Sequence, residues 1–272
     1  MSLRAPAGRM AALGALLLLA LAAAAVAAPW LAPHDPLAVR LPDALLPPSP
    51  DHLLGTDPLG RDVFSRLLYG ARISLFVGFI AVGIAVVVGT AVGLAAGFYG
   101  GWVDAVLMRL VDTLLSVPTI FLLLAVIAFV GPSLQVVMAV IGLTSWMGLA
   151  RLVRAEILSL KEREFVLAAR VLGASPLRLM LRHLLPNAFG VVLVSATLGV
   201  GGAILTESVL SYLGLGVQPP TPSWGNILNE GRVALGVAWW LTVTPGVCIL
   251  VTVLAFNLLG EGLRERLTRA DR

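Results

Sequence analysis

The feature that most limits the fold of this chain is a set of three long stretches without a charged residue. They are residues 73–103, 113–150 and 233–260, which contain 31, 38 and 28 residues. A helix crosses about 30 Å of hydrocarbon with roughly 20 apolar residues, and backbone groups there must be satisfied within the helix. Only 12% of the chain is charged, against about 25% in soluble domains. The sequence therefore predicts an all-α, polytopic membrane protein.

Six transmembrane helices are expected, because Gly131-Pro132 is a turn signal that divides the longest apolar run into two spans. The first span ends in Ala-Val-Ala-Ala-Pro, which also fits a signal-peptidase site. We favour an uncleaved helix, since five further spans follow. The predicted spans are 10–28, 74–98, 112–130, 134–151, 188–210 and 236–259. Small residues allow close helix packing in membranes, and glycines recur in the second and fifth spans: Gly78, Gly83, Gly89, Gly93, Gly97, Gly199, Gly201 and Gly202.

The distribution of positive charge predicts the orientation, because cytoplasmic loops collect Lys and Arg. With the N-terminus inside, fourteen of the 19 lysines and arginines fall on the cytoplasmic side. Both termini are then expected in the cytoplasm. We expect an N-terminal transmembrane helix at 1–30 and a proline-rich extracytoplasmic segment at 31–73, with a short amphipathic stretch at 61–72. A five-helix core is expected at 74–272, with a cytoplasmic loop at 154–187.

The cytoplasmic loop has the pattern of a helical hairpin. Residues 154–172 contain no Gly or Pro and predict one helix. Gly173 follows, where a left-handed residue commonly ends a helix. Ser175-Pro176 provide an N-cap and a first helical residue for a second helix, which is expected to end near Pro186-Asn187. From local physics alone, the hairpin fits a coupling element and a simple cover over the inner mouth of the bundle equally well.

The same loop resembles the EAA loop of ABC-importer permeases, which docks on the ATP-hydrolysing subunit. Leu167-Ala168-Ala169 is followed after three residues by Gly173, and after eleven more by Leu185-Pro186. Leu167 stands where the motif has glutamate, and Glu164 is a candidate substitute for it. Ala168 and Ala169 would present a small-residue face to a groove on the partner. The resemblance implies an ATPase-coupling loop that includes Glu164, Leu167, Ala168, Ala169, Arg170, Gly173, Ala174, Ser175, Pro176, Leu185 and Pro186.

The likeness covers most of the chain. Residues 34–75, with Gly-Thr-Asp-Pro-Leu-Gly-Arg-Asp at 55–62, and residues 205–228 resemble the C-type permeases of dipeptide, oligopeptide and nickel importers. The resemblance implies a second homologous permease, two ATP-binding-cassette ATPase subunits and an extracytoplasmic substrate-binding protein as partners. It also implies a location in the lipid bilayer of a bacterial inner membrane. The transported solute stays open, with dipeptides, longer peptides and nickel chelates as the alternatives.

No residue set in the sequence indicates chemistry of its own. The only lysine, Lys161, is followed by Glu162, so a phosphate-binding Gly-x4-Gly-Lys-Ser/Thr loop is absent. His34, His52 and His183 are far apart and lack partners at metal-ligand spacing. We therefore expect no enzyme activity, no catalytic residues, no cofactor and no metal. The net charge of +4 is explained by topology, and we expect no nucleic-acid partner.

Two other functions compete with the importer. An ion-coupled secondary transporter would need ionisable groups within the membrane, and the candidates are Asp112 and Glu207. Asp112 lies at the cytoplasmic end of the third predicted span, close to Arg109, where a paired or solvated role is favoured. Glu207 lies near the outer end of the fifth, where it would hydrogen-bond neighbouring helices or act in the pathway or in gating. A purely structural membrane protein is the third alternative.

Overall fold

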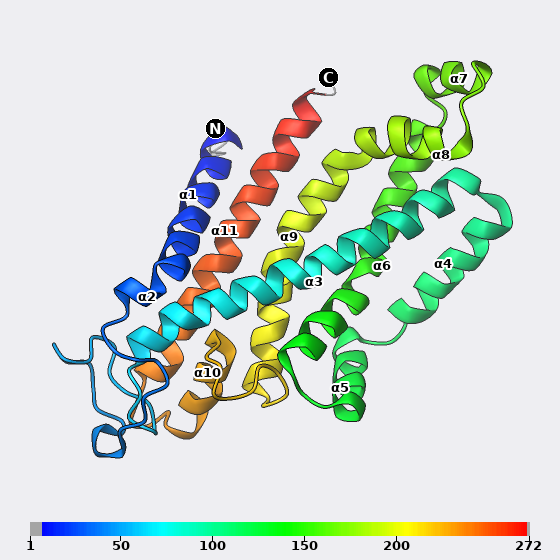
Figure 1. Cartoon of the computed structure of the whole chain (residues 1–272). Helices are drawn as coiled ribbons and strands as arrows, with labels where there is room; N and C mark the ends of the chain where they lie inside the picture. Colours follow the sequence, from blue (N-terminus) through cyan, green and yellow to red (C-terminus); the bar gives the residue numbers. More distant parts are fainter. Residues whose placement is uncertain (1–6, 271–272) are drawn as a thin grey trace, which may run out of the picture.

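The computed structural model describes residues 7–270, and every regular element within them is helical (Figure 1). An isolated antiparallel bridge joins Thr56 to Asp62. The helices are α1 (Ala7–Val26), α2 (Ala28–Leu31), the 3-10 turn η1 (Leu41–Asp43), α3 (Val63–Tyr99), α4 (Gly101–Leu115), α5 (Thr119–Val130), α6 (Leu134–Leu160), α7 (Glu164–Val171), α8 (Pro176–Arg178), the π-helical η2 (Leu179–Leu184), α9 (Leu185–Tyr212), α10 (Trp224–Val233) and α11 (Trp240–Ala270).

Within residues 7–270, five segments are long and apolar enough to cross a membrane, and a bent pair makes a sixth candidate, which confirms the predicted polytopic all-α fold. The five are Gly8–Val26, Val63–Tyr99, Leu134–Leu160, Pro176–Tyr212 and Trp240–Leu267. The bent pair is α4 with α5, whose axes meet at 83°.

The third span was wrongly predicted as one helix at 112–130. Helix α4 begins at Gly101 and ends at Leu115, and α5 starts at Thr119. Pro118 has a ψ of 125° and sits at this break. Proline has no backbone N–H and disfavours helical conformation in the residue before it. The proline therefore turns a predicted straight span into a bent pair.

Helix α3 is longer than its predicted span because it starts at Val63 rather than at residue 74. The Asp62 side chain caps it by accepting a hydrogen bond from the Ser65 N–H. The stretch 61–72, predicted as a separate outer segment, is therefore mainly the first turns of α3. The expected boundary between 31–73 and 74–272 lies inside this helix. With 37 residues at 1.5 Å each, α3 is roughly 55 Å long, so it must tilt or extend beyond the hydrocarbon.

Glycines bring α3 and α6 close together, as expected from the sequence. A Cβ added at Gly93 would lie 2.5 Å from the Ala150 carbonyl oxygen, and one at Gly89 would lie 2.8 Å from that of Trp146. Only hydrogen fits at these crossings. The expectation does not hold for every glycine in the pattern, because a Cβ at Gly83 or Gly202 would meet nothing within 4 Å.

The two ends of the bundle differ in what they carry. Both termini of the described chain lie at the end where α7 and α8 extend from the bundle (Figure 1). The irregular segment between α2 and α3 lies at the opposite end, together with α10 (Figure 1). Helix α9 connects the two ends, since the segment Pro176–Tyr212 is a continuous helical run from α8 through η2 into α9.

Candidate functional site

The α7–α8 hairpin has the predicted glycine turn. Gly173 has a φ of 80°, which only glycine adopts without strain. Its N–H donates to the Arg170 carbonyl, and the Ala174 N–H donates to the Ala169 carbonyl, which closes the end of α7. The Ser175 side chain then accepts from the Arg178 N–H, and Pro176 is the first residue of α8. The predicted roles of Gly173 and Ser175 in the backbone are therefore confirmed.

Two boundaries of the hairpin differ from the prediction. The helix expected at 154–172 is interrupted at residues 161–163, where the chain turns between α6 and α7. The second helix does not end near Pro186, because α8 continues through the π-helical η2 directly into α9. Pro186 lies in the first turn of α9, where a missing N–H is tolerated.

A small apolar core holds the hairpin against the bundle. Val166 of α7 is fully buried among residues of α6, η2 and α9, including Ile157 and Leu184. Ala169 is partly buried against the same cluster, whereas Ala168 is exposed. The two alanines therefore do not form one shared outer face, because neighbouring residues on a helix point about 100° apart.

The tip of the hairpin, where α7 ends and α8 begins, carries exposed apolar side chains. Val171 and Leu172 are each 87% exposed, and Leu177 is 62% exposed. The other residues predicted for the coupling loop surround this apolar tip. Three of them are partly buried, namely Ala169, Ala174 and Leu185. The others are exposed: Glu164, Leu167, Ala168, Arg170, Gly173, Ser175, Pro176 and Pro186. The sequence motif did not indicate Val171, Leu172 or Leu177, because their importance depends on exposure.

At the opposite end, a buried ion network joins the segment before α3 to α10. Arg61 Nε donates to Asp57 Oδ2 at 2.6 Å, and Arg61 Nη2 donates to Glu230 Oε1 at 2.8 Å. Arg66 also pairs with both acids and is 1% exposed. Each carboxylate thus contacts two guanidinium groups. Sequence reasoning had singled out residues 55–62 as a motif but had assigned them no structural role.

Tryptophans extend this outer assembly. The Trp240 indole N–H at the start of α11 donates to the Thr56 carbonyl at 3.0 Å. The Trp224 indole N–H of α10 donates to the Leu67 carbonyl of α3 at 3.1 Å. Both rings are buried. This end of the bundle is therefore a connected platform, which we call the outer platform after its predicted side and in which the segment 55–62, α3, α10 and α11 hold one another.

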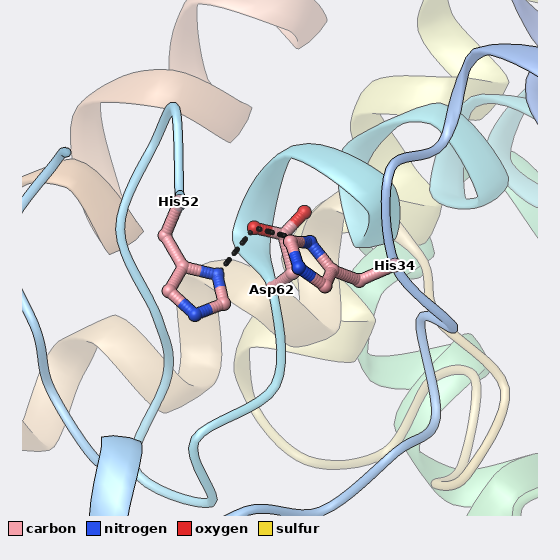
Figure 2. Close-up of side chains that lie close together, drawn as sticks. All are labelled: His34, His52 and Asp62. Carbon is pink, nitrogen blue, oxygen red and sulfur yellow. Dashed lines mark hydrogen bonds and ion pairs between the residues drawn. The ribbon is translucent and has the colours of Figure 1, made fainter. Parts of the chain in front are cut away.

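The sequence predicted that the three histidines lie far apart, and this prediction is wrong for His34 and His52. The rings of His34 and His52 lie 4.8 Å apart between centroids, and one oxygen of the Asp62 carboxylate interacts with both (Figure 2). The irregular segment before α3 folds back on the start of the helix, which brings together residues separated by 18 and 10 positions. Spacing along the sequence could not show this, because the segment has no regular period.

Glu207 is enclosed in a cluster of serines. Its side chain is fully buried, and Ser211 Oγ donates to Oε1 at 2.6 Å. The Ser74 hydroxyl of α3 lies 3.4 Å from Oε2, and it also accepts a hydrogen bond from the backbone N–H of Trp224. Glu207 therefore connects α9 with α3 and, through Ser74, with α10.

The acidic residues of α4 are paired with arginines of α6. Asp104 forms two bonds of 2.5 Å with Arg154, and Asp112 pairs with Arg151. Asp112 thus has the paired role that was favoured for it, although its partner is Arg151 rather than Arg109. These pairs hold α4 against α6 near the hairpin end of the bundle.

Comparisons with known proteins agree with this architecture. The family described as "Binding-protein-dependent transport system inner membrane component" matches residues 89–270, more than half of the chain. The dipeptide transport system permease protein DppC of Bacillus subtilis is 42% identical over 260 residues, covering 95% of this chain and 81% of that protein. The glutathione transport system permease protein GsiD of Escherichia coli O157:H7 is 45% identical over 259 residues, covering 95% and 86%.

A solved structure supports the same fold. The inward-facing MetNI methionine ABC transporter aligns with a TM-score of 0.61 and 22% identity, covering 76% of this chain and 96% of that one. The chain belongs to the family of binding-protein-dependent transport system inner membrane components, and it is a permease subunit of an ABC importer.

Proposed function

We propose that this chain forms one half of the membrane pathway of an importer for short peptides. A second, homologous permease would form the other half. Two ATP-binding-cassette ATPase subunits would hydrolyse ATP, and an extracytoplasmic binding protein would deliver the substrate. The names of the relatives, which describe dipeptide and glutathione transport, support a short peptide or a similar small solute as the substrate class.

The observation that carries the proposal is the apolar tip of the hairpin. Val171, Leu172 and Leu177 are strongly exposed on a segment that Val166 fixes to the bundle. Large exposed apolar side chains that lie together commonly mark a contact with a partner. We infer that this tip enters a groove on an ATPase subunit, that the residues of the predicted coupling loop surround the contact, and that this end of the bundle is cytoplasmic.

The continuous helix from α8 to α9 suggests how the contact would act. A displacement of the hairpin would be transmitted along Pro176–Tyr212 to the outer end, where Glu207 is bonded to Ser211 and lies beside Ser74. Because Glu207 is fully buried, we assign it a role in gating rather than in direct contact with the substrate. Switching between two states requires contacts that differ between them, and this serine cluster joins the helices that would move.

The ion-coupled alternative has little support. Family membership goes against it, and Asp112, one of its two candidate residues, is paired with Arg151. The sequence provides no phosphate-binding loop, so in our proposal the energy comes from the ATPase partners.

The experiment is an affinity pull-down of the tagged chain from native membranes, with mass spectrometry of the retained proteins. We expect a second permease and P-loop ATPases. The Leu172→Ser variant should lose the ATPases and retain the second permease, because it makes only the tip polar. Val233→Ser is the matched control, since Val233 is 82% exposed at the opposite end, and it should retain both partners.

A backbone variant tests the shape of the hairpin separately. A Cβ added at Gly173 would meet no atom within 4 Å, yet the residue has a φ of 80°. A β-branched residue such as the valine in Gly173→Val strongly disfavours this angle. We expect normal membrane insertion and loss of the ATPases. Retention of the ATPases by both Leu172→Ser and Gly173→Val would refute docking through the hairpin, and a chain that transports without any partner would refute the importer.

A further inference from the structure

His34, His52 and Asp62 form a cluster that the transport proposal does not use. His34 lies after α2, His52 in the irregular segment before α3, and Asp62 at the N-cap of α3. One possible ligand atom from each residue lies within 4.8 Å of the other two. Figure 2 shows that one oxygen of the Asp62 carboxylate interacts with both imidazole rings. Three separate parts of the outer segment thus meet at one point.

The hydrogen bonds around Asp62 leave one of its oxygens directed toward the histidines. Oδ2 accepts from the Ser65 N–H at 2.8 Å and from the Ser65 hydroxyl at 2.7 Å. Oδ1 lies 2.9 Å from His52 Nδ1 and 3.7 Å from His34 Nδ1. The helix cap therefore fixes the carboxylate through Oδ2 and leaves Oδ1 for another interaction.

The environment of His34 also indicates that a ligand is missing from this cluster. Its Nδ1 atom is buried and has no hydrogen-bond partner among the described residues. An unpaired buried polar atom destabilises the folded state, so a group that satisfies it would be favoured. A cavity of about 230 Å³ adjoins the cluster and is lined by His34, His52 and Asp62. Asp35 and Arg40 also line it and add no net charge between them.

The ligand types and distances match those of a transition-metal site. Two imidazoles and one carboxylate are common ligands of Zn²⁺, which binds nitrogen and oxygen at about 2.0–2.2 Å in tetrahedral sites. Tetrahedral ligands at those lengths are about 3.3–3.6 Å apart. Asp62 Oδ1 lies 2.9 Å from His52 Nδ1 and 3.7 Å from His34 Nδ1, and the three ligand atoms all lie within 4.8 Å of one another. Small movements would bring all three atoms to one ion, with the fourth position open to water.

We propose that His34, His52 and Asp62 bind a divalent first-row transition metal of the Zn²⁺ class. The ion joins the segment after α2 and the segment around His52 to the first turn of α3. It satisfies the unpaired His34 Nδ1 and pairs with the buried carboxylate. The site lies beside the ion network of Asp57 and Arg66, so the metal stabilises the outer platform. This inference is independent of the substrate and of the energy source.

The test measures Zn²⁺ binding to the full chain in detergent, purified with an affinity tag that contains no histidine. Isothermal titration with ZnCl2 should give one ion per chain. Co²⁺ should give the visible absorption of a tetrahedral site with nitrogen and oxygen ligands. Saturating Zn²⁺ should also raise the melting temperature, because a ligand that binds only the folded state stabilises it.

Three variants assign the binding to these residues. His34→Phe keeps a ring against His52 and removes the nitrogen, and His52→Asn keeps a donor for Asp62. Each should weaken Zn²⁺ binding by at least about 100-fold, beyond the 10–100-fold loss typical of residues that only support metal ligands. His183→Phe, at the opposite end of the bundle, is the control and should bind as the wild type does.

The results distinguish a metal site from a simple His–Asp contact. Wild-type protein that binds no Zn²⁺, or that binds it no more tightly than His34→Phe, would overturn the proposal. Loss of binding in His183→Phe alone would also overturn it. His34 is partly exposed, so its variant should fold even if the buried His52 cannot be replaced, and the melting temperature without metal verifies this.

Discussion

Arg66 is the residue on which the outer ion network depends most. It is almost fully buried and pairs with both Asp57 and Glu230. Removing one partner from a buried pair leaves an uncompensated charge, at a cost of about 3–5 kcal/mol. We expect Arg66→Leu to lower the melting temperature in detergent markedly. Arg72→Leu removes an exposed arginine from the same helix and should change it little; equal losses in both variants would show that the network adds no particular stability.

A substitution at Glu207 can separate the structural role of this residue from its proposed role in gating. In Glu207→Gln, the amide oxygen can still accept the hydrogen bond of Ser211, which is 2.6 Å long in the wild type. We therefore expect a small change in melting temperature and a clear reduction of peptide uptake in a reconstituted importer, because the ionisable carboxyl group is lost and the packing is kept. Uptake at the wild-type rate would instead make the carboxylate purely structural. Ser211→Ala keeps the carboxyl group and removes this hydrogen bond, together with the one that Ser211 Oγ accepts from the Val217 backbone N–H at 3.0 Å, so it shows the effect of losing the contacts without losing the acid.

At the scale of elements, the crossing of α3 and α6 depends on Gly93. A Cβ there would lie 2.5 Å from the Ala150 oxygen and 2.8 Å from Val153 Cβ. Overpacking of this kind costs about 1–3 kcal/mol, so Gly93→Val should lower the melting temperature and the yield of folded protein. Gly83→Val is a matched control on the same helix, because its Cβ meets no atom within 4 Å. Similar losses in both variants would assign the effect to helix propensity rather than to packing.

Helices with a strong local signal could be predicted from the sequence, and so could the turn at Gly173. The break between α6 and α7 could not, because residues 161–163 contain neither Gly nor Pro. Burial of Val166 against Ile157 and Leu184 accompanies this turn, and such packing depends on residues distant in sequence. The bend at Pro118 had a visible signal, but the surrounding apolar run suggested a straight span.

The outer end was the least predictable part of the candidate site. Asp57 and Glu230 are 173 positions apart in the sequence, yet both pair with Arg66. The His34–His52–Asp62 cluster depends on an irregular segment that has no period to extrapolate. What the sequence does offer is a concentration of ionisable residues in 55–66 outside the apolar runs, and such residues need partners when a fold buries them.

At the scale of the whole molecule, the helical run Pro176–Tyr212 connects two ends of different character. One end carries the apolar tip of the hairpin, and the other carries the serine cluster around Glu207 and the platform around Arg66. An apolar tip suits a protein partner that stays bound during the transport cycle. A rigid platform suits repeated docking of a soluble binding protein, because preformed surfaces lose less entropy on binding.

The proposed orientation gives the last prediction. With the lone cysteine replaced in a Cys248→Ser background, single cysteines can be introduced at Leu41, which is 66% exposed near the outer platform, and at Leu172, which is 87% exposed on the hairpin tip. A membrane-impermeant maleimide should label Leu41→Cys in intact spheroplasts. In cells that lack the ATPase subunits, which would otherwise cover the tip, it should label Leu172→Cys only in inverted vesicles, because the hairpin must face the side that contains ATP. The reverse pattern would place the hairpin outside and exclude its contact with a cytoplasmic ATPase.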